Sequence, residues 1–341
     1  MKPEKMLCVL LQDQQPDRIS IAEVPIRSLK QGEVLVKMKA ASLNHRDQWC
    51  RLAMYPNMKY PSILGSDGCG EVIEVFDDKD KSWIGKEVIF NPNVNWGDNP
   101  NYQSLNYTIL GMPTDGTLAE YLIIPAHRLH EKPAHLTAFE AAALPLAALT
   151  AWRAVFTKGE ISKGKNVLIT GIGGGVAQFA LLFSVAVGAN VFVTSGSEDK
   201  IQRAVELGAK MGVNYKEKGW EKILQKQVFM GFDAIIDGTG GENFGTLAKM
   251  LGFGANLVVY GGTAGTPSPI HLPRLFFSQS NIKGTTMGTD EEFEQMLDFV
   301  NKHSIVPIID SVRPLREAIS AFDRMHRAEQ FGKLVISMIN K

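Results

Sequence analysis

The fold of this chain is decided by residues 165–177, which read KNVLITGIGGGVA. An apolar run typical of a buried strand, Val167 to Thr170, leads into a glycine cluster, and a helical pattern, Gly174 to Val187, follows. Glycines allow a tight turn and let backbone N–H groups approach a pyrophosphate, while the helix N-terminus supplies partial positive charge. A glycine-rich turn alone is weak evidence, but this strand–turn–helix context predicts a dinucleotide site. The predicted contacts are Gly171, Gly173, Gly174, Gly175 and Val176.

The next predicted strand, Val191 to Ser195, indicates which dinucleotide is bound. NAD-specific sites place an Asp or Glu there to bond the adenosine 2′-hydroxyl, and this strand ends without an acid. Ser195 and Gly196 leave room for a 2′-phosphate, and Lys200 follows on the next predicted helix. We therefore expect NADPH as the cofactor, although Lys200 could instead be an ordinary solvated charge.

The pattern around this stretch predicts two kinds of architecture. Apolar strand runs and helical patterns alternate through residues 165–260, which is typical of a parallel sheet covered on both faces. Residues 1–135 contain short strands punctuated by Gly and Pro, as in an all-β barrel. A predicted helix, Glu291 to Lys302, and a closing segment complete the 341 residues, a length that favours two domains.

Composition excludes several classes of partner. The formal net charge is zero, so nothing favours electrostatic binding of nucleic acid or acidic lipid. No stretch of 18 consecutive apolar residues indicates a membrane span. The three cysteines are scattered and odd in number, which fits a reducing cytoplasm.

Several motifs occur in order along the chain and resemble the medium-chain dehydrogenase/reductase superfamily. They are KQGEVLV at 30–36, SLNHRD at 42–47, PSILGSDGCG at 61–70, DGTLAEY at 115–121 and ALPLAALTAW at 143–152. The resemblance implies an α/β protein with a GroES-like β-barrel catalytic domain and a doubly wound Rossmann cofactor domain. The implied boundaries are 1–145 with 289–341 for the catalytic domain and 146–288 for the cofactor domain. The active site would lie in the cleft between the domains.

The resemblance also bears on metal and assembly. Zinc alcohol dehydrogenases of this family use a Cys in the active-site loop, a His after a glycine, and a second Cys before the cofactor domain. Here those positions hold Asn44, Ser66 and either Leu146 or Ala147. The loop 91–117, which corresponds to the structural-zinc lobe, contains no cysteine. We therefore expect no metal, and a closer likeness to the zinc-free quinone oxidoreductases. Homodimers are common in the family, and residues 268–287 are the expected contact.

Without a metal, hydride transfer needs a substrate with its own electron sink. Quinones and α,β-unsaturated carbonyl compounds qualify, so we expect NADPH-dependent reduction of such a small electrophilic acceptor. Two alternatives stay open: a 2-alkenal or enone reductase with little quinone activity, and a non-catalytic NADPH-binding redox sensor.

The resemblance assigns roles to individual residues. Asn44 would polarise a carbonyl or, alternatively, cap a turn, and Tyr55 would donate a proton or simply pack. His45 would reach the cofactor or, equally, lie exposed in a loop, and Lys333 would contact the cofactor or be solvated. The full implied sets are Asn44, Asp47, Tyr55 and Thr150 as catalytic, Trp49 and Ser66 as substrate-binding, and His45, Tyr215, Gly238, Gly261, Gly262 and Lys333 as additional cofactor contacts.

Overall fold

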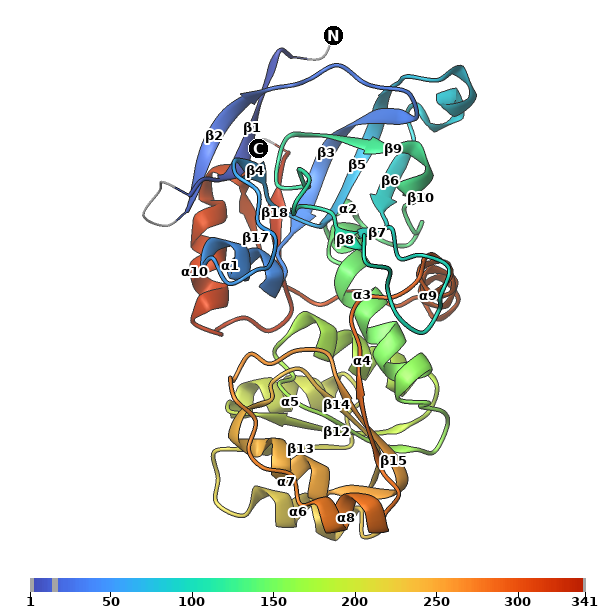
Figure 1. The fold of residues 1–341 in the computed structure, drawn as a ribbon, viewed down its shortest axis with the longest axis vertical. Helices are drawn as coiled ribbons and strands as arrows, with labels where there is room; N and C mark the ends of the chain where they lie inside the picture. Colours follow the sequence, from blue (N-terminus) through green and yellow to red (C-terminus); the bar gives the residue numbers. More distant parts are fainter. Residues whose placement is uncertain (1–2, 14–17, 340–341) are drawn as a thin grey trace. The chain divides into compact units, whose positions relative to one another are not determined.

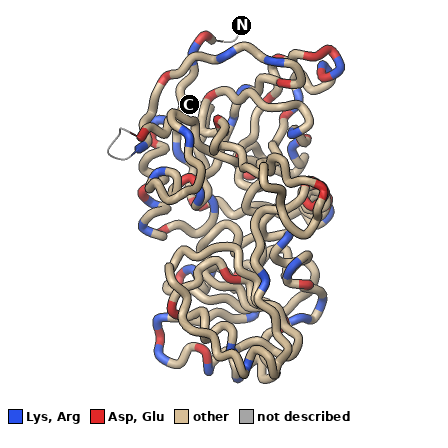
Figure 2. Tube along the Cα trace, viewed as in Figure 1, with Lys and Arg blue, Asp and Glu red and all other residues tan. Residues whose placement is uncertain are grey.

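The computed structural model describes residues 3–13 and 18–339 and divides them into two compact units (Figure 1). The first unit consists of the chain up to Leu146 together with the chain from Thr289 onward. The second unit is Ala147 to Gly288. Acidic and basic residues are interspersed along both units (Figure 2).

The first unit is built mainly from antiparallel strands with helices beside them. Its larger sheet has the order β10-β6-β5-β3-β18-β17, with β9 also paired to β3. Two smaller pairings join β2, β1 and β4, and β7 with β8. The strands are β1 (Lys5–Leu11), β2 (Ile19–Pro25), β3 (Glu33–Ser42), β4 (Ser62–Ile63), β5 (Asp67–Val75), β6 (Glu87–Phe90), β7 (Asn93–Val94), β8 (Thr108–Ile109), β9 (Tyr121–Pro125), β10 (Leu129–Glu131), β17 (Ile309–Pro314) and β18 (Lys333–Ser337). The helices are α1 (His45–Arg51), α2 (Ala138–Ala142), α9 (Asp290–His303) and α10 (Ala318–His326), while α3 (Pro145–Trp152) begins in this unit and continues into the second.

The last strand of the chain lies inside this sheet. β18 pairs antiparallel with β3, where Val335 faces Ser42, and parallel with β17, where Lys333 faces Ile309. Figure 1 shows the red C-terminal elements α10, β17 and β18 beside the blue N-terminal strands. A core cluster formed by residues from both ends, among them Leu43, Phe322 and Ile336, closes this part of the unit.

The second unit is a parallel sheet with the strand order β13-β12-β11-β14-β15-β16. Numbered from its first strand, this is the order 3-2-1-4-5-6 of the dinucleotide-binding Rossmann fold, so the predicted α/β class is confirmed. Its strands are β11 (Asn166–Ile169), β12 (Asn190–Ser195), β13 (Met211–Asn214), β14 (Phe232–Asp237), β15 (Leu251–Val259) and β16 (Asn281–Gly284). Its helices are α4 (Gly175–Ala186), α5 (Glu198–Glu206), α6 (Trp220–Gln227), α7 (Phe244–Lys249) and α8 (Leu272–Phe277).

The apolar strand run that suggested this sheet is buried on both faces. Val167, Leu168 and Ile169 of β11 are fully buried, because β11 lies between β12 and β14 and helices cover the sheet. Each such side chain contributes about 1.5–3 kcal/mol by leaving water. In the described part of the chain, no helix is long and apolar enough to cross a membrane.

Candidate active site

The loop between β3 and α1 is held by Asp47. Its carboxylate accepts hydrogen bonds from the backbone N–H of Asn44 over 2.8 Å and of Gly65 over 3.2 Å. Asp47 is fully buried, and burial raises the pKa of its carboxyl while the charge of Arg46 opposes that rise. This carboxylate therefore joins the two segments, 42–47 and 61–70, that the sequence placed in the active site.

A buried ammonium group lies against the Asn44 side chain. Lys333 Nζ donates to Asn44 Oδ1 over 2.7 Å, to Asp67 Oδ2 over 3.0 Å and to the Leu43 carbonyl oxygen over 2.9 Å. Asn44 Nδ2 donates in turn to Asp67 Oδ2 over 2.9 Å, and the Leu146 backbone N–H donates to Asp67 Oδ1 over 2.7 Å. Lys333 and Asp67 form an ion pair whose two side chains are 4% and 0% exposed.

Lys333 is thus not the solvated lysine of the alternative interpretation, and its predicted cofactor contact stays a prediction. An ammonium has three N–H donors, and all three face acceptors within the unit. A cofactor contact would have to displace one of them. The sequence showed only a Gly-Lys pair and gave no indication of the buried partner, Asp67.

A second buried cation holds Ser66. Arg46 Nη1 donates to Ser66 Oγ over 2.7 Å and to the Leu110 carbonyl oxygen over 2.9 Å, and Nη2 donates to the Met112 carbonyl oxygen over 3.3 Å. Ser66 Oγ donates to the same Leu110 oxygen over 2.7 Å. The Tyr55 ring lies under the guanidinium, 4.6 Å from its carbon to the ring centroid, and the Tyr55 hydroxyl accepts from Arg46 Nε over 3.3 Å.

These contacts place the remaining residues predicted for the first unit. Ser66 is fully buried and its hydroxyl is engaged as donor and acceptor, so the predicted substrate contact would require Arg46 or Leu110 to release it. Trp49 is half-buried and His45 is exposed. Their assigned roles stay predictions.

Tyr107, in the loop 91–117, is a polar residue that the sequence analysis did not single out. Its hydroxyl is buried and, among the residues that the structure describes, has no hydrogen-bond partner. Burial raises the pKa of this phenol, and the neighbouring Tyr55 raises it further, so it stays protonated at neutral pH. Nothing in the sequence of this polar loop indicated that the Tyr107 hydroxyl is buried.

The side chains at the three metal-ligand positions do not fit zinc. Asn44 Oδ1 faces the Lys333 ammonium, Ser66 Oγ faces the Arg46 guanidinium, and Leu146 contributes only a backbone N–H. A catalytic zinc needs three protein ligands of the imidazole, thiolate or carboxylate type. Within 3–13 and 18–339 no group of three or more His, Cys, Asp or Glu residues is arranged to hold a metal ion.

The glycine turn of the second unit has the form that the sequence predicted. Gly171 adopts a positive φ of 61°, and the Gly174 N–H donates to its carbonyl oxygen over 3.1 Å. A Cβ on Gly171 would come within 2.9 Å of Thr239. Helix α4 then begins at Gly175, so Gly173, Gly175 and Val176 lie at a helix N-terminus at the carboxyl end of β11. This is where a pyrophosphate fits.

The end of β12 is close to a cation that the sequence analysis missed. A Cβ on Gly196 would lie 2.7 Å from Lys216 Cε, 3.1 Å from Lys216 Nζ and 3.0 Å from the Tyr215 hydroxyl. Ser195 pairs with Asn214, so the register of β12 and β13 brings Tyr215 and Lys216 to this point. Lys200, on α5, is half-buried. Only the register of β12 against β13 places Lys216 beside Gly196, and the sequence alone does not give this register.

The glycines after β14 and β15 pack against one another. A Cβ on Gly238 would lie 2.4 Å from the Tyr260 ring, and one on Gly261 would lie 2.9 Å from the Gly238 oxygen. A Cβ on Gly262 would meet nothing within 4 Å. Loop packing therefore already requires glycine at the first two positions, and their predicted cofactor contacts stay predictions, as does that of Gly262.

Thr150 is the remaining predicted catalytic residue of the second unit. It is buried on α3, and its hydroxyl lies 3.8 Å from the Met287 sulfur. Its predicted place beside the nicotinamide stays a prediction.

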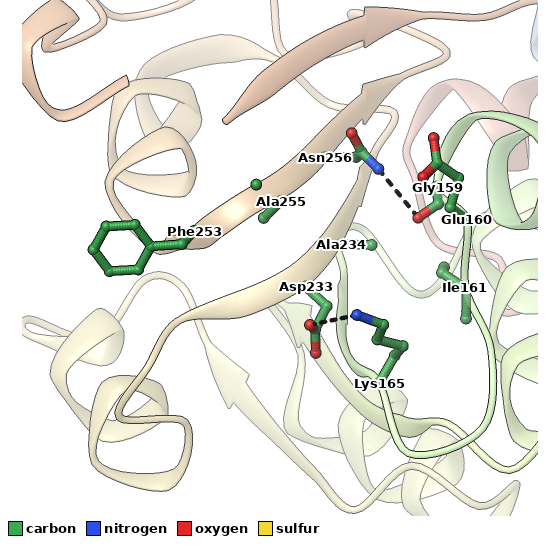
Figure 3. Close-up of a pocket in the computed structure, with 10 residues that line it drawn as sticks. Gly159, Glu160, Ile161, Lys165, Asp233, Ala234, Phe253, Ala255 and Asn256 are labelled. Atoms are coloured by element: carbon green, nitrogen blue, oxygen red, sulfur yellow. Dashed lines mark hydrogen bonds and ion pairs between the residues drawn. The ribbon is translucent and has the colours of Figure 1, made fainter. Parts of the chain in front are cut away.

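A pocket of about 150 Å³ lies at the opposite end of the parallel sheet from the glycine turn. Figure 3 shows Lys165 and Asp233, at the amino ends of β11 and β14, joined by an ion pair of 3.0 Å. Figure 3 also shows the Asn256 amide pointing to the Gly159 carbonyl oxygen. Because Rossmann folds bind cofactor at the carboxyl ends of the strands, this pocket is not the cofactor site.

Comparison with known proteins identifies the family. The alcohol dehydrogenase GroES-like domain family matches residues 30–134, and the zinc-binding dehydrogenase family matches residues 175–302. A zinc-type alcohol dehydrogenase-like protein, YogA, from Leptosphaeria maculans is 38% identical over 327 residues, covering 90% of this chain and 91% of the relative. The crotonyl-CoA carboxylase/reductase of Cereibacter sphaeroides is 26% identical over 355 residues, covering 92% and 82%.

A solved structure also resembles this chain over nearly its whole length. The crystal structure of an NAD-dependent alcohol dehydrogenase superposes with a TM-score of 0.90 at 33% identity, covering 97% of this chain and 99% of that one. The fold and these matches define an oxidoreductase of the α/β class, with a GroES-like domain and a Rossmann domain. The chain belongs to the medium-chain dehydrogenase/reductase superfamily.

Proposed function

We propose that this protein is an NADPH-dependent reductase that transfers hydride to quinones or other α,β-unsaturated carbonyl compounds without a metal. The observation that carries the proposal is the pair of buried cations, because Lys333 and Arg46 engage the side chains at the first two metal-ligand positions. An alcohol dehydrogenase uses the metal as a Lewis acid on oxygen. A conjugated acceptor delocalises the incoming electrons itself, so a hydrogen-bond donor suffices.

The proposed reaction needs no reactant beyond NADPH, the acceptor and one proton. When bound, the nicotinamide would supply a hydride to the β-carbon of an enone or to a quinone, and the cofactor would be left oxidised as NADP⁺. The electron pair moves to the carbonyl oxygen, giving an enolate or hydroquinone anion, and one proton completes the product. In this proposal Asn44 offers that oxygen the amide N–H that Asp67 does not accept. Tyr55 is the candidate proton donor, because its hydroxyl accepts from Arg46 Nε and keeps its own hydrogen to give. Burial raises the pKa of Tyr107, which suits its hydroxyl to donating a hydrogen bond and not the proton itself.

The proposed choice of NADPH rests on the end of β12. It has no acid, and the Tyr215 hydroxyl and the Lys216 ammonium lie close to Gly196. A 2′-phosphate bound beside Gly196 would gain a charge-assisted hydrogen bond from Lys216, which is worth about 1.5–3 kcal/mol. Relatives named as NAD-dependent alcohol dehydrogenases make NADH the competing cofactor to be tested.

We further infer a cytoplasmic homodimer. Among the residues that the structure describes, β16 pairs only with β15. The other edge of β16 can therefore pair with a strand of a second copy. Leu272, Phe276 and Phe277 of the preceding helix α8 are 63%, 61% and 74% exposed. A second copy that paired along β16 would cover these apolar side chains.

One assay tests the activity. The protein is mixed with NADPH or NADH and a panel of quinones, enones and 2-alkenals, and loss of nicotinamide absorbance is followed. We expect oxidation of NADPH by at least one conjugated acceptor and none by saturated ketones. If the protein reduces 2-alkenals but not quinones, the alternative of a 2-alkenal reductase is favoured. Binding of NADPH without oxidation by any acceptor would contradict the proposal and favour a redox sensor. Oxidation of simple alcohols that requires added zinc would also contradict it.

A further inference from the structure

We propose that Lys333 is a positioning residue that fixes the direction of the Asn44 carboxamide, so that an N–H rather than an oxygen meets the negative charge developing on the acceptor. This inference rests on the proposed reductase function. It assigns to Lys333 neither a substrate contact nor a cofactor contact, because its three donors are all engaged within the unit.

The two ends of the Asn44 amide can be told apart by their partners. The Lys333 ammonium can only donate a hydrogen bond, and the Asp67 carboxylate can only accept one. Asn44 Oδ1 therefore lies against Lys333 Nζ at 2.7 Å, and Asn44 Nδ2 lies against Asp67 Oδ2 at 2.9 Å. A flipped amide would set N–H against ammonium and oxygen against carboxylate. The ion pair thus admits one orientation.

The same arrangement leaves one N–H for a substrate. An amide nitrogen carries two hydrogens in a plane, and Asp67 accepts one of them. The second points away from Asp67. Asn44 keeps 7% of its surface exposed, while Asp67 behind it is fully buried. The proposal takes this remaining N–H as the part of Asn44 that an acceptor reaches.

The frame behind Asn44 is rigid. Asp67 Oδ1 accepts from the Leu146 N–H over 2.7 Å, and Lys333 also donates to the Leu43 carbonyl oxygen over 2.9 Å. Donors that are fixed before the reaction need no reorganisation when charge develops on the substrate, and removal of one such donor costs about 100- to 1000-fold in kcat. In place of a metal, the chain would use an internal cation to orient a neutral donor.

Variants of the pair test this through a double-mutant cycle. Asn44→Ala removes the donor, and we expect kcat to fall about 100-fold. Lys333→Met removes the ammonium but keeps the length of the side chain, and we expect a fall of about 10- to 100-fold with the NADPH dissociation constant unchanged. In the Asn44→Ala background, Lys333→Met should have little further effect. Multiplying losses in the double variant would overturn the positioning role.

Two further measurements exclude a merely structural effect. Lys333→Ala leaves a cavity, and added ethylammonium should restore part of kcat; no rescue in a folded variant would count against the proposal. Asn44→Ser keeps a hydroxyl that can accept from Lys333 and donate to Asp67 but leaves no N–H for the substrate, so it should fold and be as slow as Asn44→Ala. The matched control is Lys132→Met, since Lys132 also donates to a backbone carbonyl, that of Leu136, but lies outside the site.

A binding readout separates this inference from the proposed function. The probe is p-nitrophenolate, an oxyanion that resembles the hydroquinone anion, titrated with NADP⁺ present. We expect Lys333→Met and Asn44→Ala to weaken its binding by a similar factor. If wild type reduces acceptors and both variants bind the probe as wild type does, only the positioning role fails. If wild type neither reduces an acceptor nor binds the probe, the reductase function and this inference fall together.

Discussion

Arg46 and Ser66 share one acceptor, the carbonyl oxygen of Leu110, while the guanidinium also donates to the Ser66 hydroxyl over 2.7 Å. This triangle attaches the end of the loop 91–117 to helix α1. Arg46 adds a contact to the Met112 carbonyl oxygen on the same loop. A guanidinium thus connects segments at a position where the zinc enzymes of the superfamily have a metal ligand.

The first prediction concerns metal content. Purified protein, dialysed exhaustively, should contain far less than one zinc per chain by elemental analysis, and a chelator should leave its activity unchanged. The reason is that Asn44 and Ser66 are hydrogen-bonded to cations, which repel a divalent ion. About one tightly held zinc per chain would contradict the prediction.

The second prediction concerns the cofactor phosphate. Lys216→Ala should weaken NADPH binding about 10- to 100-fold, the value of a charge-assisted contact, and leave NADH binding nearly unchanged. Lys200→Ala should act in the same direction if Lys200 also reaches the phosphate. Ser195→Asp should tilt preference toward NADH. Fluorescence titration with both cofactors measures this.

The control for the cofactor titration is Lys218→Ala, because Lys218 is exposed and close in sequence but is not among the atoms bordering Gly196. Equal weakening of NADPH and NADH by Lys216→Ala would show that no phosphate pocket exists there. Tighter binding of NADH by wild type would show the same.

The third prediction concerns assembly. Wild type should sediment as a dimer at micromolar concentration, and Phe277→Glu should shift it toward monomer because a buried, unpaired carboxylate is costly. Phe229→Glu is the control, since Phe229 is 92% exposed but lies in the loop after α6. A wild-type monomer would contradict the prediction. A dimer that Phe229→Glu disrupts and Phe277→Glu does not would show that the contact lies elsewhere.

The fourth prediction concerns stability against pH. Burial, and then the charge of Arg128, lower the pKa of His130 from 6.5 to about 4. Above pH 6.5 the imidazole is neutral in both the folded and the unfolded chain. Below pH 6.5 the unfolded chain takes up the proton before the folded chain does, so folding loses stability until the pH falls past the folded pKa. The total loss is about 3 kcal/mol.

Urea unfolding at a series of pH values measures this loss. His130→Gln should remove that part of the slope between pH 6.5 and 4. His127→Gln should not, because His127 is exposed. An unchanged slope in His130→Gln would show that other groups carry the acid sensitivity.

The sequence was sufficient for the fold where local pattern and tertiary structure agree. The apolar run before Gly171 became β11, and the alternation that followed became the parallel sheet, because a strand buried on both faces must be apolar throughout. The site was harder to predict. Asn44 and Ser66 were recognised by motif, but their partners Lys333 and Arg46 depend on pairings between segments far apart in sequence, such as β3 with β18. Lys216 was not predicted for the same reason, because its place beside Gly196 depends on the pairing of β12 with β13.

The place of β18 also governs the order in which the chain can fold during synthesis. The ribosome makes Ala147 to Gly288 before it makes Lys333 to Ser337, so the nascent first unit has neither a neighbour for β3 on that side nor a counter-charge for buried Asp67. The Rossmann unit is contiguous and can close as soon as its last strand emerges. The part of the molecule that begins the sequence is therefore the part that is finished last.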